Sequence, residues 1–132
     1  MRHFTVDEAN DALQLVRPLA EELVGVYRRA NRVEQRAAPL RAAVAGNGSV
    51  GMRERLQDHE RVAAAAGSRM RALVEEIEAL GAEVKDLELG LVDFPAEREG
   101  ETVLLCWRVG EEEIGYWHGL EEGFAGRRPL PL

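Results

Sequence analysis

The sequence has few of the residue types that would point to a particular class of protein. Its 132 residues include one cysteine and one lysine, Lys85, and aromatic residues make up 5%. A single cysteine excludes an intramolecular disulfide and a zinc finger built from cysteines. No apolar run approaches the roughly 20 residues that span a bilayer, and the first ten residues lack the apolar segment of a signal peptide. We therefore expect a cytoplasmic protein with no membrane partner.

Negative charge is concentrated in the last third of the chain. The formal net charge is −7, and residues 82–132 hold 12 acidic against 5 basic side chains. Because nucleic-acid binding depends on a cationic surface, this balance argues against nucleic acid as a partner. The basic residues gather at positions 28–41, where Arg28, Arg32 and Arg36 share one helix face. We interpret this face as solvated and predict no nucleic-acid binding at physiological salt.

The first predicted helix covers residues 6–45. Thr5 and Glu8 have the spacing of a capping box, in which each side chain accepts from the other residue's backbone N–H, so the helix should begin at Val6. Apolar residues then recur every three or four positions to the end of the helix. Pro18 lies inside this pattern, lacks a backbone N–H and crowds the preceding turn, which predicts a kink there.

The second predicted helix covers residues 52–81 and has the most regular pattern in the chain. Residues suited to a helix–helix seam recur in strict steps of four and three from Met52 to Val84, as in an antiparallel coiled coil. The breaker-rich segment 46–51 separates the helices, so they should form a hairpin that projects as a stalk. An alanine-rich seam buries little area, which favours self-association as a homodimer. His59 takes a seam position and is interpreted as a half-buried structural side chain.

Strand-like alternation marks three segments in the range 87–118. The strongest segment places Trp107 and Cys106 on opposite faces. Turn residues separate the segments, so an antiparallel meander is expected, followed by an irregular arm that Phe124 anchors. The expected strands are residues 87–94, which stop at Pro95, residues 102–109 and residues 114–118, and the arm covers residues 119–132.

These elements predict an α+β fold in a single domain of residues 1–132. Hydrophobic residues make up 45% of the chain, which is typical of a globular protein. Pairing across the hairpin loop leaves residues 6–16 without a helical partner. Ala9, Leu13 and Val16 should therefore pack on the three-stranded meander, which seats the hairpin on the sheet.

Several short runs in the chain also match a known family pattern. The runs are Phe4-Thr5, Glu8-Ala9-Asn10, Lys85-Asp86, Gly90 to Ala96, Leu105-Cys106-Trp107, Gly110-Glu111 and Tyr116-Trp117-His118. With these runs the chain resembles, over nearly its whole length, a family of small prokaryotic proteins catalogued as domain of unknown function 2203. The resemblance implies a family, and it implies no activity, cofactor or catalytic residue.

The reactive side chains of the meander are candidates for a metal site. Cysteine, histidine and carboxylate together suit zinc or another divalent transition metal. The alternative is that Cys106 is a small buried hydrophobe and that Asp93 and His118 make local polar contacts. Whether His118 lies near Cys106 depends on the strand register. The candidate ligands are Asp93, Cys106, Glu111 and His118.

Other residues are candidates for ligand binding. A lysine beside acidic residues can act as a nucleophile or an anion contact, and the alternative for Lys85 is a solvated ion pair with Glu83 or Asp86. The candidates are Lys85, Asp86, Asp93, Trp107 and Trp117.

The function expected from these observations is that of an interaction or scaffold protein without enzymatic activity. The sequence shows no nucleophile–base pair and no phosphate-binding loop, whereas the seam of the second helix is regular. Such a protein would self-associate through its helices, and an unidentified protein partner is also compatible with it. The alternative is a protein, or an enzyme, that binds a metal or a small ligand in the meander around Asp93, Cys106 and His118.

Overall fold

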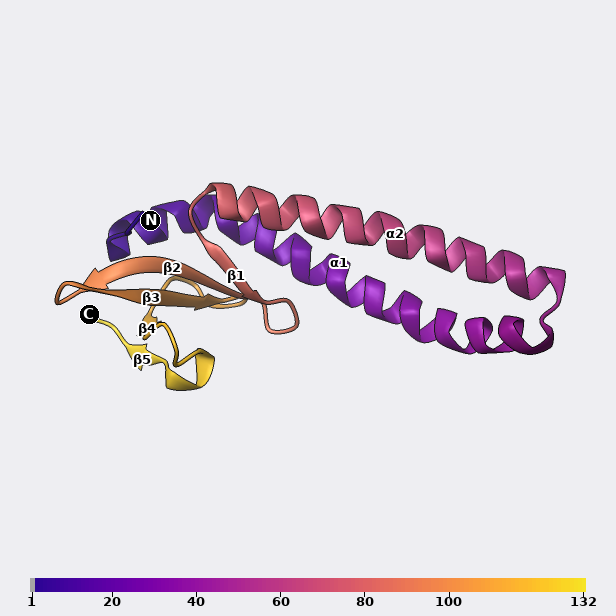
Figure 1. Cartoon of the computed structure of the whole chain (residues 1–132). Coiled ribbons are helices and arrows are strands. Elements are labelled where there is room, and N and C mark those ends of the chain that lie inside the picture. Colours follow the sequence, from indigo (N-terminus) through magenta and orange to yellow (C-terminus); the bar gives the residue numbers. More distant parts are fainter. Residues whose placement is uncertain (1) are drawn as a thin grey trace.

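The protein consists of a long helical hairpin seated on a small antiparallel sheet (Figure 1). The computed structural model describes residues 2–132. The α+β class predicted from the sequence is confirmed. No helix in this range combines the length and the apolar character needed to cross a membrane. The elements are α1 (Val6–Asn47), α2 (Val50–Ala79), β1 (Glu83–Asp86), β2 (Leu91–Arg98), β3 (Glu101–Arg108), β4 (Tyr116–His118), the 3-10 helix η1 (Phe124–Gly126) and β5 (Arg128–Pro129).

Helix α1 begins where the capping box predicts. The Glu8 N–H donates to Thr5 Oγ1 at 3.0 Å and the Thr5 N–H donates to Glu8 Oε1 at 2.8 Å, which satisfies two backbone donors at the helix start. The helix is continuous through Pro18 and Pro39 for 42 residues. Its first turns lie over the sheet at an angle to the remainder of the helix (Figure 1). The helix therefore accommodates Pro18 as a bend and does not break there.

Helix α2 pairs with α1 along the predicted seam. Ser49 caps its start by accepting from the Met52 N–H at 3.2 Å. Every seam residue on the helix is buried or half-buried, and Leu56, Leu73 and Ile77 are buried. Leu73 and Ile77 belong to the core that both helices share with the strands. Toward the tip the seam is mostly half-buried, because each helix has only the other to cover it.

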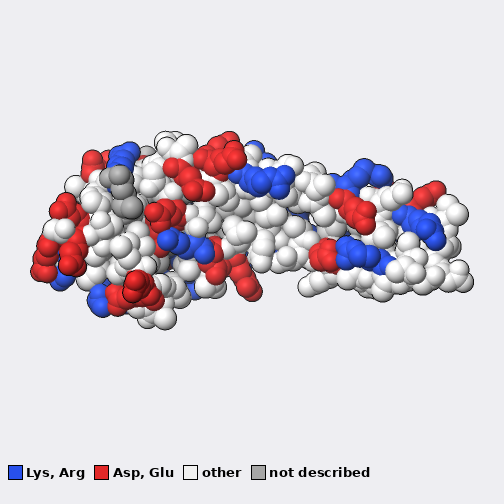
Figure 2. Space-filling view, in the orientation of Figure 1, with Lys and Arg blue, Asp and Glu red and all other residues white. Residues whose placement is uncertain are grey.

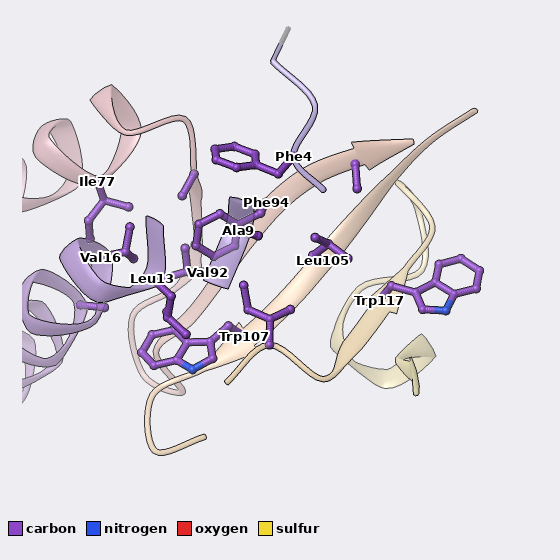
Figure 3. Close-up of a cluster of buried hydrophobic side chains, with 14 of the residues drawn as sticks. Phe4, Ala9, Leu13, Val16, Ile77, Val92, Phe94, Leu105, Trp107 and Trp117 are labelled. Atoms are coloured by element: carbon purple, nitrogen blue, oxygen red, sulfur yellow. The ribbon is translucent and has the colours of Figure 1, made fainter. Parts of the chain in front are cut away.

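The first segment of α1 packs on the sheet, as predicted. Ala9, Leu13 and Val16 are at most 2% exposed and lie in one core with Phe94 and Trp107 (Figure 3). These side chains come from one helix and two strands. The shared core fixes the base of the hairpin to the strands.

The sheet has five strands, so the predicted number of three is wrong. Neighbouring strands pair antiparallel in the order β1-β2-β3-β4-β5. Strand β1 was not predicted because Val84 continues the four-three repeat of α2. The helix in fact ends at Ala79, and Gly81 turns the chain with a φ of +94°. Strand β5 was not predicted because a segment of two residues, one of them Pro129, is too short to show strand alternation.

The predicted strand 87–94 also starts too early and stops too soon. Residues 87–90 form a turn, and β2 continues through Pro95 to Arg98. The Pro95 carbonyl accepts from the Phe4 N–H at 2.7 Å. Since the N and O of a strand residue point to the same side, the N–H that Pro95 lacks would face Phe4 and not β3. The ladder between β2 and β3 therefore loses no hydrogen bond at the proline.

The sheet separates two sets of side chains. Alternation along β2 and β3 turns Phe94 and Trp107 toward the helices, and it turns Asp93 and Cys106 to the opposite face. The C-terminal arm, including Phe124, lies against this second face. The candidate ligands therefore lie on the side of the sheet away from the hairpin.

Candidate metal centre

Three buried side chains of metal-ligand type converge on the second face of the sheet. Asp93 on β2 lies directly opposite Cys106 on β3. On the next strand Tyr116 lies opposite Cys106 and His118 lies opposite Leu104, which puts His118 on the same face, diagonal from Cys106. One ligand atom from each of Asp93, Cys106 and His118 lies within 4.8 Å of the other two. All three residues are at most 3% exposed.

The hydrogen bonds of His118 fix which ring nitrogen faces the cluster. Nδ1 lies 2.7 Å from the Gly119 carbonyl oxygen, which can only accept, so Nδ1 holds the hydrogen and donates. In the neutral ring Nε2 then has a lone pair, and it lies 3.1 Å from Asp93 Oδ2. A lone pair and a carboxylate oxygen at this distance need a proton or a cation between them.

Asp93 has more acceptor capacity than its neighbours satisfy. Its Oδ1 is buried and has no hydrogen-bond partner among residues 2–132, and a buried acceptor without a partner costs about 1–3 kcal/mol. Burial raises the pKa of the Asp93 carboxyl, and the neighbouring His118, the Cys106 thiol and Lys85 only partly oppose this. A proton or a positive ion at this position would relieve both effects.

The Cys106 thiol is not an activated nucleophile. Burial, together with the adjacent Asp93, raises the pKa of Cys106 to about 12, so the sulfur is protonated at neutral pH. The hydrogen-bond contact of His118 Nε2 is with Asp93 Oδ2 and not with the sulfur, so the ring is not placed to act as a base for the thiol. Coordination to a metal ion would displace the thiol proton and give a thiolate.

A cavity of about 240 Å³ opens beside the cluster. Apolar side chains from the sheet and the arm form most of its wall, and Lys85 adds a positive charge. Lys85 is ion-paired with Glu83 at 3.0 Å and its side chain is 44% exposed, which is the structural alternative considered from the sequence. The register of β1 shifts between Val84 and Asp86, and this irregularity presents Lys85 at the wall. The lining residues are Lys85, Leu91, Asp93, Leu104, Cys106, His118, Leu120, Glu121, Gly123 and Phe124.

Two of the acidic candidates have structural contacts outside the cluster. Glu111 accepts from Arg127 at 2.8 Å and from the Arg108 N–H at 2.7 Å. Asp86 accepts from the Leu89 N–H at 2.8 Å in the turn after β1. Both carboxylates hold turns beside the site and contribute no ligand atom to the cluster.

Neither tryptophan lines the cavity beside the cluster. Trp107 is fully buried on the helix side of the sheet, and its Nε1–H donates to the Glu111 carbonyl at 3.0 Å. Trp117 contacts the guanidinium groups of Arg98 and Arg128, each of which lies 4.8 Å from the ring centroid. The structure therefore brings Lys85 and Asp93 to one cavity and places both tryptophans elsewhere.

The C-terminal arm supplies cavity residues that sequence reasoning missed, among them Leu120 and Glu121. The one signal in the sequence was Phe124, the single aromatic residue of the tail at residues 119–132. Arg127 ties the arm to the sheet, because its guanidinium group pairs with Glu111 and lies 3.9 Å from the centroid of the Tyr116 ring.

The fold and the cluster together define the class of protein. It is an α+β protein with a helical hairpin on one face of a sheet and a buried group of carboxyl, thiol and imidazole side chains on the other. The chain belongs to the family described as uncharacterized conserved protein (DUF2203), whose family model matches residues 2–130. This match confirms the resemblance identified in the sequence. No curated protein and no solved structure matches the chain.

Proposed function

We propose that Asp93, Cys106 and His118 bind one divalent transition-metal ion, with zinc as the preferred ion. The observation that supports this most is the 3.1 Å contact between His118 Nε2 and Asp93 Oδ2 beside a buried thiol. A metal ion would satisfy both acceptors and hold the sulfur as a thiolate. Asp93 Oδ1, which is buried without a hydrogen-bond partner among residues 2–132, could coordinate the ion in place of Oδ2.

The separations between the ligand atoms are compatible with zinc. Zinc bonds of about 2.0–2.3 Å place neighbouring ligand atoms roughly 3.3–3.8 Å apart around a tetrahedron. The distance of 3.1 Å between His118 Nε2 and Asp93 Oδ2 lies close to this range. All three ligand atoms lie within 4.8 Å of one another, and small side-chain movements would bring any longer separation into the range. The bond from His118 Nδ1 to the Gly119 carbonyl is the outer contact that orients a metal-bound histidine.

Three protein ligands leave one coordination position for another molecule. Catalytic zinc sites have three protein ligands and one position for water or substrate, whereas structural sites have four protein ligands. The cavity beside the cluster gives such a molecule room. A zinc ion held by these three residues would supply Lewis-acid chemistry, in which the metal lowers the pKa of a bound water and polarises carbonyl groups. The proposal therefore favours a metal-dependent enzyme over a structural metal site.

Metal content tests the proposal directly. The full chain, purified under reducing conditions and loaded with Zn²⁺ or Co²⁺, should keep close to one ion per chain through gel filtration, and the Co²⁺ form should show a thiolate-to-cobalt charge-transfer band. The double variant Cys106→Ala, His118→Ala should lose both the bound ion and the charge-transfer band. His59→Ala is the matched control, because His59 is half-buried on α2, as its seam position predicts, and lies outside the cluster. Wild-type protein that keeps no ion and gains no thermal stability from zinc would refute the proposal.

Self-association through the hairpin is a second candidate function. A groove on the hairpin has an apolar floor that includes Val62, whose exposure is 53%. Arg29, Arg32 and Arg36 line the same groove, whereas acidic residues gather at the sheet end of the molecule (Figure 2). Two copies packed antiparallel would cover both grooves and bring unlike charges together.

Sedimentation velocity at micromolar concentration tests this second candidate. We expect a dimer that dissociates as the salt concentration rises, because salt screens the charge pairing. Val62→Glu should give a monomer, and Val50→Glu is the control, since Val50 is 72% exposed at the hairpin tip and lies outside the groove. A monomeric wild-type protein at all concentrations would contradict the candidate.

A further inference from the structure

The cavity beside the cluster combines one basic side chain with mainly apolar walls. Lys85 is the only lysine in the chain, and its positive charge acts on Asp93, which lines the same cavity. Leu91, Leu104 and Phe124 supply apolar surface from the sheet and from the arm. A site of this kind recognises a ligand with one anionic group and a small apolar part.

We propose that this cavity binds a small organic carboxylate, whose carboxylate group contacts the Lys85 ammonium and the metal ion. The apolar part of the ligand would lie against Leu104 and Phe124. The inference rests on the metal site proposed above. The cavity of about 240 Å³ is smaller than the roughly 300–1,000 Å³ of sites for drug-sized ligands, so the carboxylate is a compact one.

The charge balance of the proposed metal site, with the positive charge of Lys85 included, favours an anionic fourth ligand. A divalent ion held by the Cys106 thiolate, the Asp93 carboxylate and a neutral His118 has no net charge. A carboxylate at the fourth position adds one negative charge to a largely buried site, where an unbalanced charge is unfavourable. The Lys85 ammonium supplies the balancing charge from the cavity wall.

Two acidic side chains lie near the lysine and are compatible with this role. Glu83 is ion-paired with Lys85 at 3.0 Å and its side chain is 39% exposed. Glu121 lines the cavity and is exposed. A lysine ammonium has three N–H donors, so Lys85 can hold Glu83 and still donate to a ligand.

The test uses the Co²⁺-loaded full chain and three molecules of nearly equal shape. Isobutyrate is the probe, and isobutyramide and isobutylamine are its neutral and cationic counterparts. We expect isobutyrate alone to change the visible cobalt spectrum in a saturable way. Lys85→Met should weaken isobutyrate binding by about tenfold to a hundredfold, the effect of losing a hydrogen bond to a charged group, and should not weaken cobalt binding. Glu83→Gln is the matched control and should not weaken isobutyrate binding.

The possible outcomes separate this inference from the proposed function. A wild-type protein that binds no cobalt would refute the metal site itself. Cobalt bound with its thiolate band, but without a response to isobutyrate, would overturn the carboxylate inference alone. Tighter binding of isobutylamine than of isobutyrate would overturn it too, and so would an isobutyrate affinity that Lys85→Met leaves unchanged.

Discussion

Asp93 and Cys106 face each other directly across β2 and β3, on the face of the sheet that the helices do not cover. Burial raises the pKa of both side chains. Each group therefore binds a proton more tightly than it would in water, and a metal ion must compete with protons at both groups.

Replacing Asp93 by asparagine should separate metal binding from folding. Asp93→Asn keeps the shape of the side chain and removes its charge, so zinc affinity should fall by at least about a hundredfold, beyond the effect of losing an outer contact. The metal-free variant should be at least as stable as the wild type, because the asparagine amide can donate to His118 Nε2 and no buried carboxyl remains. Calorimetric titration with zinc and unfolding in urea measure the two effects. Zinc affinity equal to that of the wild type would contradict the assignment of Asp93 as a ligand.

The metal-free protein should lose stability as the pH rises above 9. Folding raises the pKa of Cys106 from 9.0 to about 12, so between these values the folded chain keeps a proton that the unfolded chain loses. Because the folded state binds more protons in this window, the free energy of unfolding decreases as the pH rises. Urea unfolding at several pH values should show this decrease, and Cys106→Ala should make it smaller. Equal decreases in both proteins would show that the thiol is not the cause.

Gly90→Ala should destabilise the protein more than Gly100→Ala does. Both glycines have positive φ, +70° and +82°, so alanine adds backbone strain of about 1–2 kcal/mol at either position. At Gly90 an added Cβ would lie 2.6 Å from Val109 Cγ2 and 2.9 Å from Val24 Cγ2, whereas nothing lies within 4 Å at Gly100. Overpacking should add about 1–3 kcal/mol at Gly90 alone. Equal losses in urea unfolding would show that the turn relaxes away from α1.

Arg127→Met should loosen the C-terminal arm over the cluster. Arg127 donates to both carboxylate oxygens of Glu111 at 2.8 Å and lies over the Tyr116 ring. Losing these contacts should increase the rate at which a thiol reagent modifies Cys106 in the metal-free protein by about tenfold, as the arm opens more often. Arg128→Met is the control, because Arg128 pairs with Glu122 in an exposed part of the arm. Equal modification rates in the two variants would show that Arg127 does not hold the arm over the cluster.

Local interactions explain the parts of the fold that the sequence predicts well. The capping box of Thr5 and Glu8 involves residues three positions apart, and the seam of α2 follows a repeat that any window of the helix contains. Alternation along β3 likewise assigns Trp107 and Cys106 to opposite faces without knowledge of the partner strands. Each of these features is determined within a few residues of the chain.

The cluster depends on contacts that no local pattern shows. His118 joins Cys106 because β4 pairs with β3 in one register, and a slip of one residue would turn His118 toward the helices. The segment before β4 is held by Arg17 of α1, which donates to the carbonyls of Glu111 and Glu112. The contacts of Arg17 that help to set the register thus span 94 and 95 positions of the sequence. For this reason the candidate residues could be named from the sequence, whereas their arrangement into one site could not be predicted from it.

The placement of the cluster opposite the helices leaves the hairpin free to vary in length. No residue of α1 or α2 lines the cavity beside the cluster, and the shared core extends along the helices only to Val26 and Ala66. Removing or adding seven residues in each helix would keep the four-three phase of the seam and move the tip by about 10 Å with little rotation. The length of the hairpin therefore sets the distance between the tip and the cavity, and this length can change while the residues that line the cavity stay the same.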